Sequence, residues 1–139
     1  MTTVGLPRHT DRAMSSENVE VVRRIYAAWT EGTSARGFMT TDIEYVNPPD
    51  AVETGTLYGP ESFGLIRDAY DDVEVRPDRF IDAGDEVVVV ATVTGIGRGG
   101  RIPVERQQGY VWTIKDGKAI RFRWFNDPRQ AFDAVGIEQ

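Results

Sequence analysis

Apolar residues recur at helical spacing between residues 15 and 32. Four of them, three or four positions apart, share one face of a helix: Val19, Val22, Tyr26 and Trp29. Ser15 or Ser16 can cap the first turn, because a short side-chain oxygen accepts hydrogen bonds from its free backbone N–H groups. The pattern therefore predicts a helix over residues 15–32. Residues 1–13 have no such period and are predicted to form a disordered tail, with Met14 as an alternative start.

Residues 60–72 show a second helical period. Proline suits the first turn of a helix, and Pro60 stands at its start. The inward stripe of this predicted helix holds four residues: Phe63, Ile66, Ala69 and Tyr70. Between the two helices, residues 42–47 alternate between apolar and polar, which predicts a short strand with Tyr45 and Asn47 on one face.

From residue 73 the apolar period changes to the alternation that is typical of strands. Four strands are predicted, over residues 73–83, 86–94, 102–114 and 119–126, and Asp116-Gly117 is a hairpin turn between the last two. Asp127, Pro128 and Gln130 then match the start of a short helix that ends at Gly136. Helices followed by strands indicate an α+β domain, in which about three helices pack against a curved antiparallel sheet of about four to six strands. Such a sheet encloses an apolar hollow, where small molecules often bind.

Composition restricts the chemistry further. The 139 residues include no cysteine and one histidine, His9, so we expect no metal site, no cofactor and no Ser-His-Asp triad. The net charge of −6 argues against binding to nucleic acid or to an anionic membrane. No apolar run approaches the ~20 residues that a membrane span needs. We therefore expect a single soluble, cytoplasmic domain over residues 14–139.

Three stretches of the sequence resemble one known family. They are residues 16–26 (SENVEVVRRIY), residues 42–49, which end in Asn-Pro-Pro, and residues 111–118 (VWTIKDGK) with Asp127-Pro128 and Ala134-Val135-Gly136 behind them. In these stretches the chain resembles the SnoaL-like family of the nuclear transport factor 2-like superfamily. The resemblance implies a cone-shaped α+β barrel, often dimeric, on a scaffold that hosts isomerases, cyclases, hydrolases, dehydratases and binding proteins.

The catalytic groups of two related enzyme types are mostly not matched. In ketosteroid isomerases of this fold a strand aspartate is the base, but Asn47 occupies that position, and an amide cannot accept a proton near neutral pH. Limonene-type epoxide hydrolases hold their attacking water with a strand Tyr-x-Asn, which Tyr45-Val46-Asn47 resembles. Their Asp-Arg-Asp centre has no counterpart here. The resemblance therefore supports the fold more than any one reaction.

Three residues are the candidate catalytic groups. Tyr45 and Asn47 could orient a reacting oxygen or a water molecule, or Asn47 could instead hold the backbone turn before Pro48. Glu105 is the only acid inside a long central strand. Facing inward, it would lose solvation and serve as an acid or base; facing outward, it would pair with a nearby arginine.

Aromatic and amide side chains are the candidate ligand-binding groups. Alternation along residues 102–114 puts Gln108 on the apolar face, although a bulge would turn Glu105 inward instead. The other inward-facing candidates, which could equally be ordinary core, are Tyr26, Trp29, Phe63, Tyr70, Tyr110, Trp112, Phe122, Trp124 and Asn126. We therefore expect a cavity for a flat, mostly apolar molecule.

Two functions of different kinds fit these residues. One is an acid-base isomerase, cyclase or epoxide hydrolase that acts on a small apolar organic substrate. The other is a non-catalytic ligand-binding or dimer-forming module, which the lack of an inward pair of acids favours. The resemblance, with Phe125 on the outward face of the last strand, also predicts a homodimer.

Overall fold

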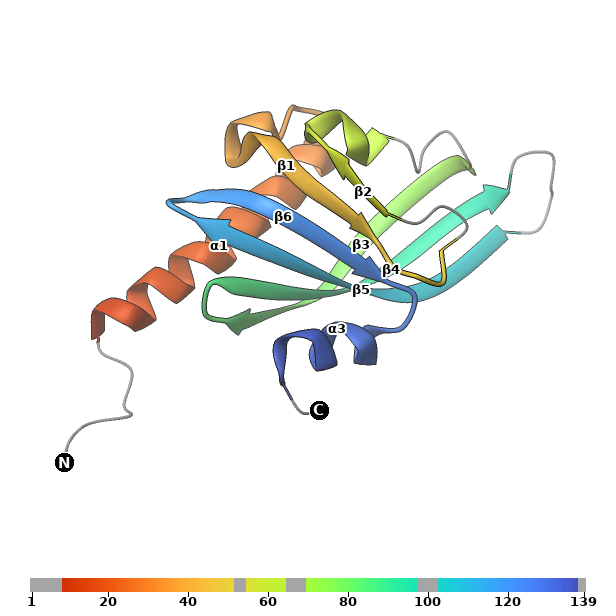
Figure 1. The fold of residues 1–139 in the computed structure, drawn as a ribbon. Coiled ribbons are helices and arrows are strands. Elements are labelled where there is room, and N and C mark those ends of the chain that lie inside the picture. The colour runs from red at the N-terminus through yellow and green to blue at the C-terminus, as the bar shows by residue number, and fades with distance from the viewer. Residues whose placement is uncertain (1–8, 52–54, 65–69, 98–102, 138–139) are drawn as a thin grey trace.

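The computed structural model describes residues 9–51, 55–64, 70–97 and 103–137, and its strands form one curved sheet (Figure 1). In this part of the chain the sheet has six strands in the order β2-β1-β6-β5-β4-β3. Their bounds are β1 Met39–Asn47, β2 Gly55–Tyr58, β3 Tyr70–Ala83, β4 Glu86–Gly97, β5 Pro103–Lys115 and β6 Lys118–Phe125. The predicted α+β class with a curved sheet is confirmed.

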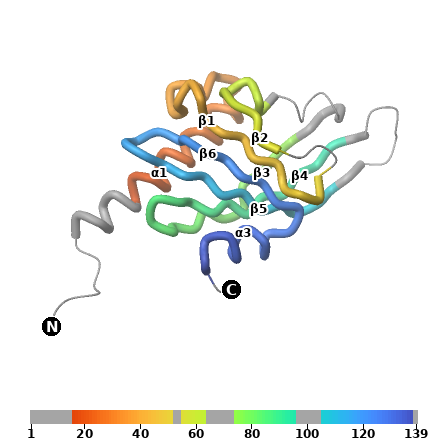
Figure 2. The backbone as a smooth tube through the Cα atoms, in the orientation of Figure 1, coloured from red at the N-terminus to blue at the C-terminus, as the bar shows by residue number. Residues whose placement is uncertain are grey.

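Neighbouring strands are antiparallel with one exception. β1 runs parallel to β6 (Figure 2). In this pairing Tyr45 lies opposite Phe122. The sheet is therefore mixed, whereas the sequence predicted a wholly antiparallel one. The hairpin signals that support antiparallel pairing are local, and no local pattern reports that the first strand joins the last.

Helix α1, His9–Glu31, crosses the face of the sheet that we call the inner face. Its buried side chains, which pack against the strands, are Val22, Ile25, Tyr26 and Ala28. The predicted apolar stripe is therefore confirmed. The helix starts earlier than predicted because neither glycine nor proline interrupts residues 9–31, and a helix that has formed extends at little cost. Residues 1–8 of the predicted tail lie outside the described residues.

Helix α3, Pro128–Val135, covers part of the opposite, outer face of the sheet. Asp127 caps it as predicted: one carboxylate oxygen accepts from the backbone N–H of Arg129 at 2.9 Å. The helix lies so close to β5 that a Cβ atom on Gly109 would come within 2.8 Å of Pro128 Cα. Glycine at this position therefore allows α3 to dock. Among the described helices, none combines the length with the apolar composition that a membrane crossing requires.

Alternate residues of β5 divide between the two faces. Gln108, Tyr110 and Trp112 belong to the inner face, while Val111 packs with Phe132 of α3 on the outer face. The pairing of β5 with β4 runs in unbroken register, so the bulge that would have turned Glu105 inward is not there. The predicted inward face of this strand is confirmed.

The predicted second helix is wrong in its last turn. A short 3-10 helix, η2 (Pro60–Gly64), occupies its start, and residues 65–69 lie outside the described residues. Tyr70 begins β3 instead of ending a helix, and it pairs with Gly97 of β4. Pairing with a long neighbouring strand overrides a helical spacing of apolar residues. Strand β2 was not predicted, because four residues are too few to show alternation.

Candidate functional site

Aromatic side chains from α1, η2 and several strands form one cluster on the inner face. Trp112 lies fully buried at its centre, and its ring stacks on Phe63 with the ring centroids 5.5 Å apart. Phe122 contacts both of these rings. Other predicted ligand-binding residues that join the cluster are Tyr26, Trp29 and Tyr110. The structure therefore brings these residues together, and their rings pack on one another as in a protein core.

Two indole N–H groups of the inner face are bonded within the protein. Trp112 Nε1 donates to Tyr26 Oη at 3.1 Å, and Trp124 Nε1 donates to Asn47 Oδ1 at 2.7 Å. A buried donor that loses its acceptor is costly, so these bonds hold the rings in place. Neither indole N–H is left to bind a ligand.

The Asn47 side chain joins three strands. Its Oδ1 accepts from Trp124 of β6, and its Nδ2 donates to the backbone oxygen of Gly55 in β2 at 3.3 Å. Asn47 and Gly55 are also opposite each other in the register of β1 and β2. The amide is thus committed to holding the end of β1, and its role in orienting a water molecule stays a prediction.

Gln108 is the buried amide of the inner face. Its Oε1 accepts from Tyr110 Oη at 2.8 Å, and within the described residues no hydrogen bond is made by Nε2. Among the described residues, Arg123 Nε is the one fully buried side-chain nitrogen or oxygen that has no hydrogen-bond partner. Gln108 Nε2 is therefore not such an atom, and it has no hydrogen-bond partner in the described part of the chain although the residue is buried. It is a free donor in an aromatic surrounding.

Tyr45 provides a second open polar group on the same face. No hydrogen bond joins its hydroxyl to another described residue, while its ring contacts Phe63 and Phe122. Burial raises the pKa of Tyr45 to about 12, and burial likewise raises the pKa of Tyr110 above its ordinary value, with the nearby Tyr45 adding to the rise. Both phenols are therefore neutral at physiological pH. We call Tyr45, Gln108 and Tyr110 the inner polar cluster.

Glu105 lies away from the inner polar cluster. It pairs with Thr94 of β4 and shares the outer face with Val111, because alternate residues of a strand point to opposite sides. Its exposed side chain lines a hollow of about 480 Å³ on that face, together with Arg76, Asp78, Thr92, Arg106 and Gln107. The structure therefore does not bring Glu105 together with Tyr45 and Asn47.

This outer hollow was not found by reasoning from the sequence. Two of its lining residues are joined by a hydrogen bond of 2.6 Å, from the Thr92 hydroxyl to Asp78 Oδ2. That bond, and next the contact with Arg76, lower the pKa of the Asp78 carboxyl. The available signal was Pro77, because a proline inside a strand indicates an edge strand or a bulge, and one of the two register shifts between β3 and β4 lies there.

Buried acids are missing from the described residues. Their buried polar side chains are Ser62, Thr92 and Gln108, and none of these is a carboxylate. In the same residues no group of three His, Asp or Glu side chains is arranged to hold a metal ion. Each of the three buried polar side chains is a neutral hydrogen-bonding group.

A groove of about 310 Å³ runs between α1 and β3. Tyr26 and Phe80 form much of its apolar lining, and the Arg23 guanidinium lies 4.5 Å from the centroid of the Phe80 ring. Such a cation–π contact holds the guanidinium group over the Phe80 ring. Of the predicted ligand-binding residues, Tyr26 contributes to this groove.

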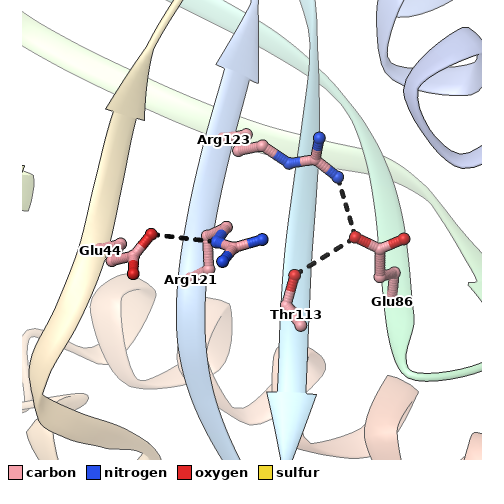
Figure 3. A network of polar contacts seen from close by, with 5 residues as sticks. All are labelled: Glu44, Glu86, Thr113, Arg121 and Arg123. Atoms are coloured by element: carbon pink, nitrogen blue, oxygen red, sulfur yellow. Dashed lines mark hydrogen bonds and ion pairs between the residues drawn. The ribbon is translucent and has the colours of Figure 1, made fainter. Parts of the chain in front are cut away.

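Figure 3 shows a charged network on the outer face of the sheet. Arg123 Nη2 lies 2.8 Å from Glu86 Oε2, and the hydroxyl of Thr113 donates to the same oxygen at 3.3 Å. Arg121 pairs with Glu44 on β1, at 3.1 Å. Both arginines point away from the inner face, as alternation along the last strand predicted.

Two predicted residues are placed only in part. Tyr70 begins β3, but its side chain lies outside what the structure describes. Asn126 follows β6 directly and is half-buried. Neither residue is assigned to the inner polar cluster.

Comparison with known families identifies this architecture. The model of the SnoaL-like domain matches residues 22–122, from the buried part of α1 to β6. The chain belongs to the SnoaL-like family. This result confirms the resemblance seen in the sequence. No curated protein matches the chain significantly.

Solved structures share the fold of this SnoaL-like domain along most of its length. An NTF2-like protein from Burkholderia thailandensis is 24% identical, with a TM-score of 0.70 over 83% of this chain and 96% of that one. TerC, co-crystallised with polyporic acid, is 24% identical, with a TM-score of 0.68 over 86% and 98%. A hypothetical protein from Catenulispora acidiphila with a ketosteroid isomerase-like fold, in complex with trimethylamine, is 22% identical, with a TM-score of 0.63 over 86% and 94%. At these identities the similarity shows the fold alone.

Proposed function

We propose that this SnoaL-like domain binds a small, flat, mostly apolar organic molecule on the inner face of its sheet, beside Gln108. The observation that carries the proposal is the Gln108 amide, which is buried among aromatic rings and yet has a nitrogen without a hydrogen-bond partner among the described residues. Polar groups inside proteins are nearly always hydrogen-bonded, so an open donor in such a lining suits a ligand. Aromatic walls with few polar groups are typical of small-molecule sites.

The structural relatives support binding of this kind. TerC was crystallised with polyporic acid and the protein from Catenulispora acidiphila with trimethylamine, so two proteins of this fold take small molecules. The family also includes cyclases and isomerases. We infer that this chain also binds a small molecule. The residues of its inner face then determine which class of molecule it binds.

Binding fits the described residues better than proton transfer does. A general base must accept a proton near neutral pH, and the buried polar side chains described here include no carboxylate. Because burial raises the pKa of Tyr45 to about 12, its phenol is a proton donor in hydrogen bonds and not a base at neutral pH. The inner polar cluster can therefore hold a ligand without ionising.

Amide chemical shifts can test the proposed site with indane, a flat hydrocarbon, as the probe. Binding on the inner face should shift residues on that side of the strands, such as Gln108, Tyr110 and Ala91, more than their outer neighbours Gln107 and Thr113. These neighbours are matched controls because they lie on the same strands. Shifts confined to the outer face, or none up to the solubility of indane, would contradict the proposal.

Catalysis by Tyr45, Asn47 and Glu105 is the alternative function. It predicts turnover of epoxides or enolisable ketones that falls in Tyr45→Phe, Asn47→Ala and Glu105→Gln. Turnover that is present and unchanged in all three variants would remove this assignment of the site. Turnover that depends on Glu105 would show that a group outside the inner face acts in the reaction.

We also propose that the chain forms a homodimer through its outer face. Support comes from the resemblance of the sequence to a family that is often dimeric and from Phe125, which is half-buried on that face. Light scattering should give twice the monomer mass of 15.5 kDa. The monomer mass itself would contradict the proposal. A cytoplasmic location remains a prediction.

A further inference from the structure

Some hydrogen-bonding groups on the inner face are bonded to other protein groups, whereas others have no partner among the described residues. The indole N–H groups of Trp112 and Trp124 already donate within the protein, and Asn47 both accepts and donates there. Groups of this face that no hydrogen bond joins to another described residue include the indole N–H of Trp29, Gln108 Nε2 and the hydroxyl of Tyr45. Both nitrogens can only donate, and the neutral phenol carries a proton to donate. The open groups therefore call for acceptors on the ligand.

The hydrogen bond from Tyr110 determines that the nitrogen of the Gln108 amide, and not its oxygen, is left without a partner. A glutamine amide can turn over about its last bond, which exchanges a donor for an acceptor. Here Tyr110 Oη donates to Gln108 Oε1 at 2.8 Å, and both side chains are buried. This bond fixes the oxygen toward Tyr110 and leaves Nε2 as the end of the amide without a partner among the described residues.

We infer that the bound molecule carries a neutral carbonyl oxygen, of a ketone, quinone or ester, which accepts a hydrogen bond from Gln108 Nε2. Tyr110 is the positioning residue, because it acts on the ligand through the Gln108 amide. The inference rests on the proposed function and adds the class of ligand. A carboxylate fits less well, since no lysine or arginine is buried among the described residues and a buried anion needs a partner.

Three probes of nearly one shape test the class of ligand. Indane has no polar atom, 1-indanone adds one carbonyl oxygen, and 1-aminoindane adds a donor and a charge. Affinities measured by titration should rank 1-indanone above indane by roughly threefold to tenfold, as one net hydrogen bond allows. 1-Aminoindane should bind no better than indane.

Variants of Gln108 separate recognition from packing. Gln108→Met keeps the length of the side chain and removes the amide, so the preference for 1-indanone should vanish while indane still binds. Gln108→Glu should also lose the preference, because a carboxylate accepts where the amide donates. Gln107→Met is the matched control on the outer face and should keep the full preference. In the wild type, 1-indanone should shift the side-chain NH₂ signal of Gln108.

Tyr110→Phe tests the positioning role. Freed from Tyr110, the amide should turn between two states, so the preference for 1-indanone should fall two- to threefold with indane affinity unchanged. Adding Tyr110→Phe to Gln108→Met should cause no further loss of preference, whereas independent effects would add. Equal weakening of both probes would make Tyr110 merely structural and overturn its positioning role.

The outcomes distinguish this inference from the proposed function. If indane binds on the inner face but 1-indanone binds no tighter, or 1-aminoindane binds tightest, the ligand class is wrong and the proposed site survives. If neither indane nor 1-indanone binds, the proposed function fails and takes the inference with it. A preference that persists in folded Gln108→Met and Gln108→Glu would assign carbonyl recognition to another group and overturn the role of Gln108.

Discussion

Trp124 on β6 donates a hydrogen bond of 2.7 Å from its indole nitrogen to Oδ1 of Asn47 at the end of β1. The bond spans the parallel strand pair that joins the first part of the chain to the last. Because Asn47 also donates to the backbone of Gly55, one amide connects β6, β1 and β2. A residue that the sequence offered as a catalytic candidate is thus also a structural link.

Asn47→Ala should destabilise the fold more than it changes ligand binding. The indole nitrogen of Trp124 and the backbone oxygen of Gly55 both lose their partners, which should lower the free energy of unfolding by about 1–3 kcal/mol. Urea denaturation measures this loss, and titration with 1-indanone measures affinity. Asn47→Asp, which keeps the acceptor for Trp124, should lose less stability. A stable Asn47→Ala variant without affinity for the probe would contradict the structural role.

Gly109→Ala should loosen α3 from the sheet. The new methyl group would lie 2.7 Å from Ala131 Cβ and 2.8 Å from Pro128 Cα, so α3 or β5 must move. Overpacking of this kind costs about 1–3 kcal/mol, and urea denaturation of the variant should show it. Gly37→Ala is the matched control, because a Cβ there meets no atom within 4 Å. Equal stability of the two variants would mean that α3 does not need the close approach.

Glu86→Gln should weaken the charged network of the outer face. The Arg123 and Glu86 side chains are only 24% and 27% exposed, so the arginine would keep its charge with little water around it. We expect a loss of about 1–2 kcal/mol in the free energy of unfolding, between the values for exposed and buried pairs. Glu20→Gln, which breaks the exposed pair with Arg24, should cost less than about 0.5 kcal/mol. A larger loss in the control would contradict this account.

Stability should fall at alkaline pH because of the buried tyrosines. The pKa of Tyr45 is raised to about 12, above its usual value of 10, so the folded state holds the proton more tightly than the unfolded state. Its contribution is complete below about pH 10 and is lost as the pH rises to about 12. The full loss from Tyr45 is about 2–3 kcal/mol.

Urea denaturation at pH 8 and at pH 11 measures this effect. Tyr45→Phe should be less sensitive to pH, because its residue 45 cannot ionise. Tyr58→Phe is the control, since Tyr58 is 64% exposed. If Tyr58→Phe reduced the sensitivity as much as Tyr45→Phe does, burial would not be the cause.

Local patterns predicted the parts of this fold that depend on neighbours in the chain. The stripe of Val22 and Tyr26 is set by helical spacing, and the cap at Asp127 by three residues within four positions, so both could be predicted. The partner of β1 could not, because it lies at the far end of the chain. The end of the second predicted helix failed for the same reason, since Tyr70 pairs with distant Gly97.

Local patterns likewise predicted some features of the candidate site and missed others. Alternation along β5 placed Gln108 on the inner face, and the structure agrees. The orientation of Glu105 depended on an unbroken register with β4, which no residue of β5 reveals by itself. The bonds that commit Asn47 and leave Gln108 open join side chains from different strands, so their pattern appears only in the folded chain.

The parallel pairing of β1 with β6 also determines when the domain can finish folding. During synthesis on the ribosome, β1 emerges long before β6. Until β6 is available, the backbone groups on that edge of β1 stay unpaired. Contacts between such distant segments slow folding. A nascent chain that stops before β6 therefore exposes an unpaired strand edge, and it should depend on chaperones until β6 has emerged.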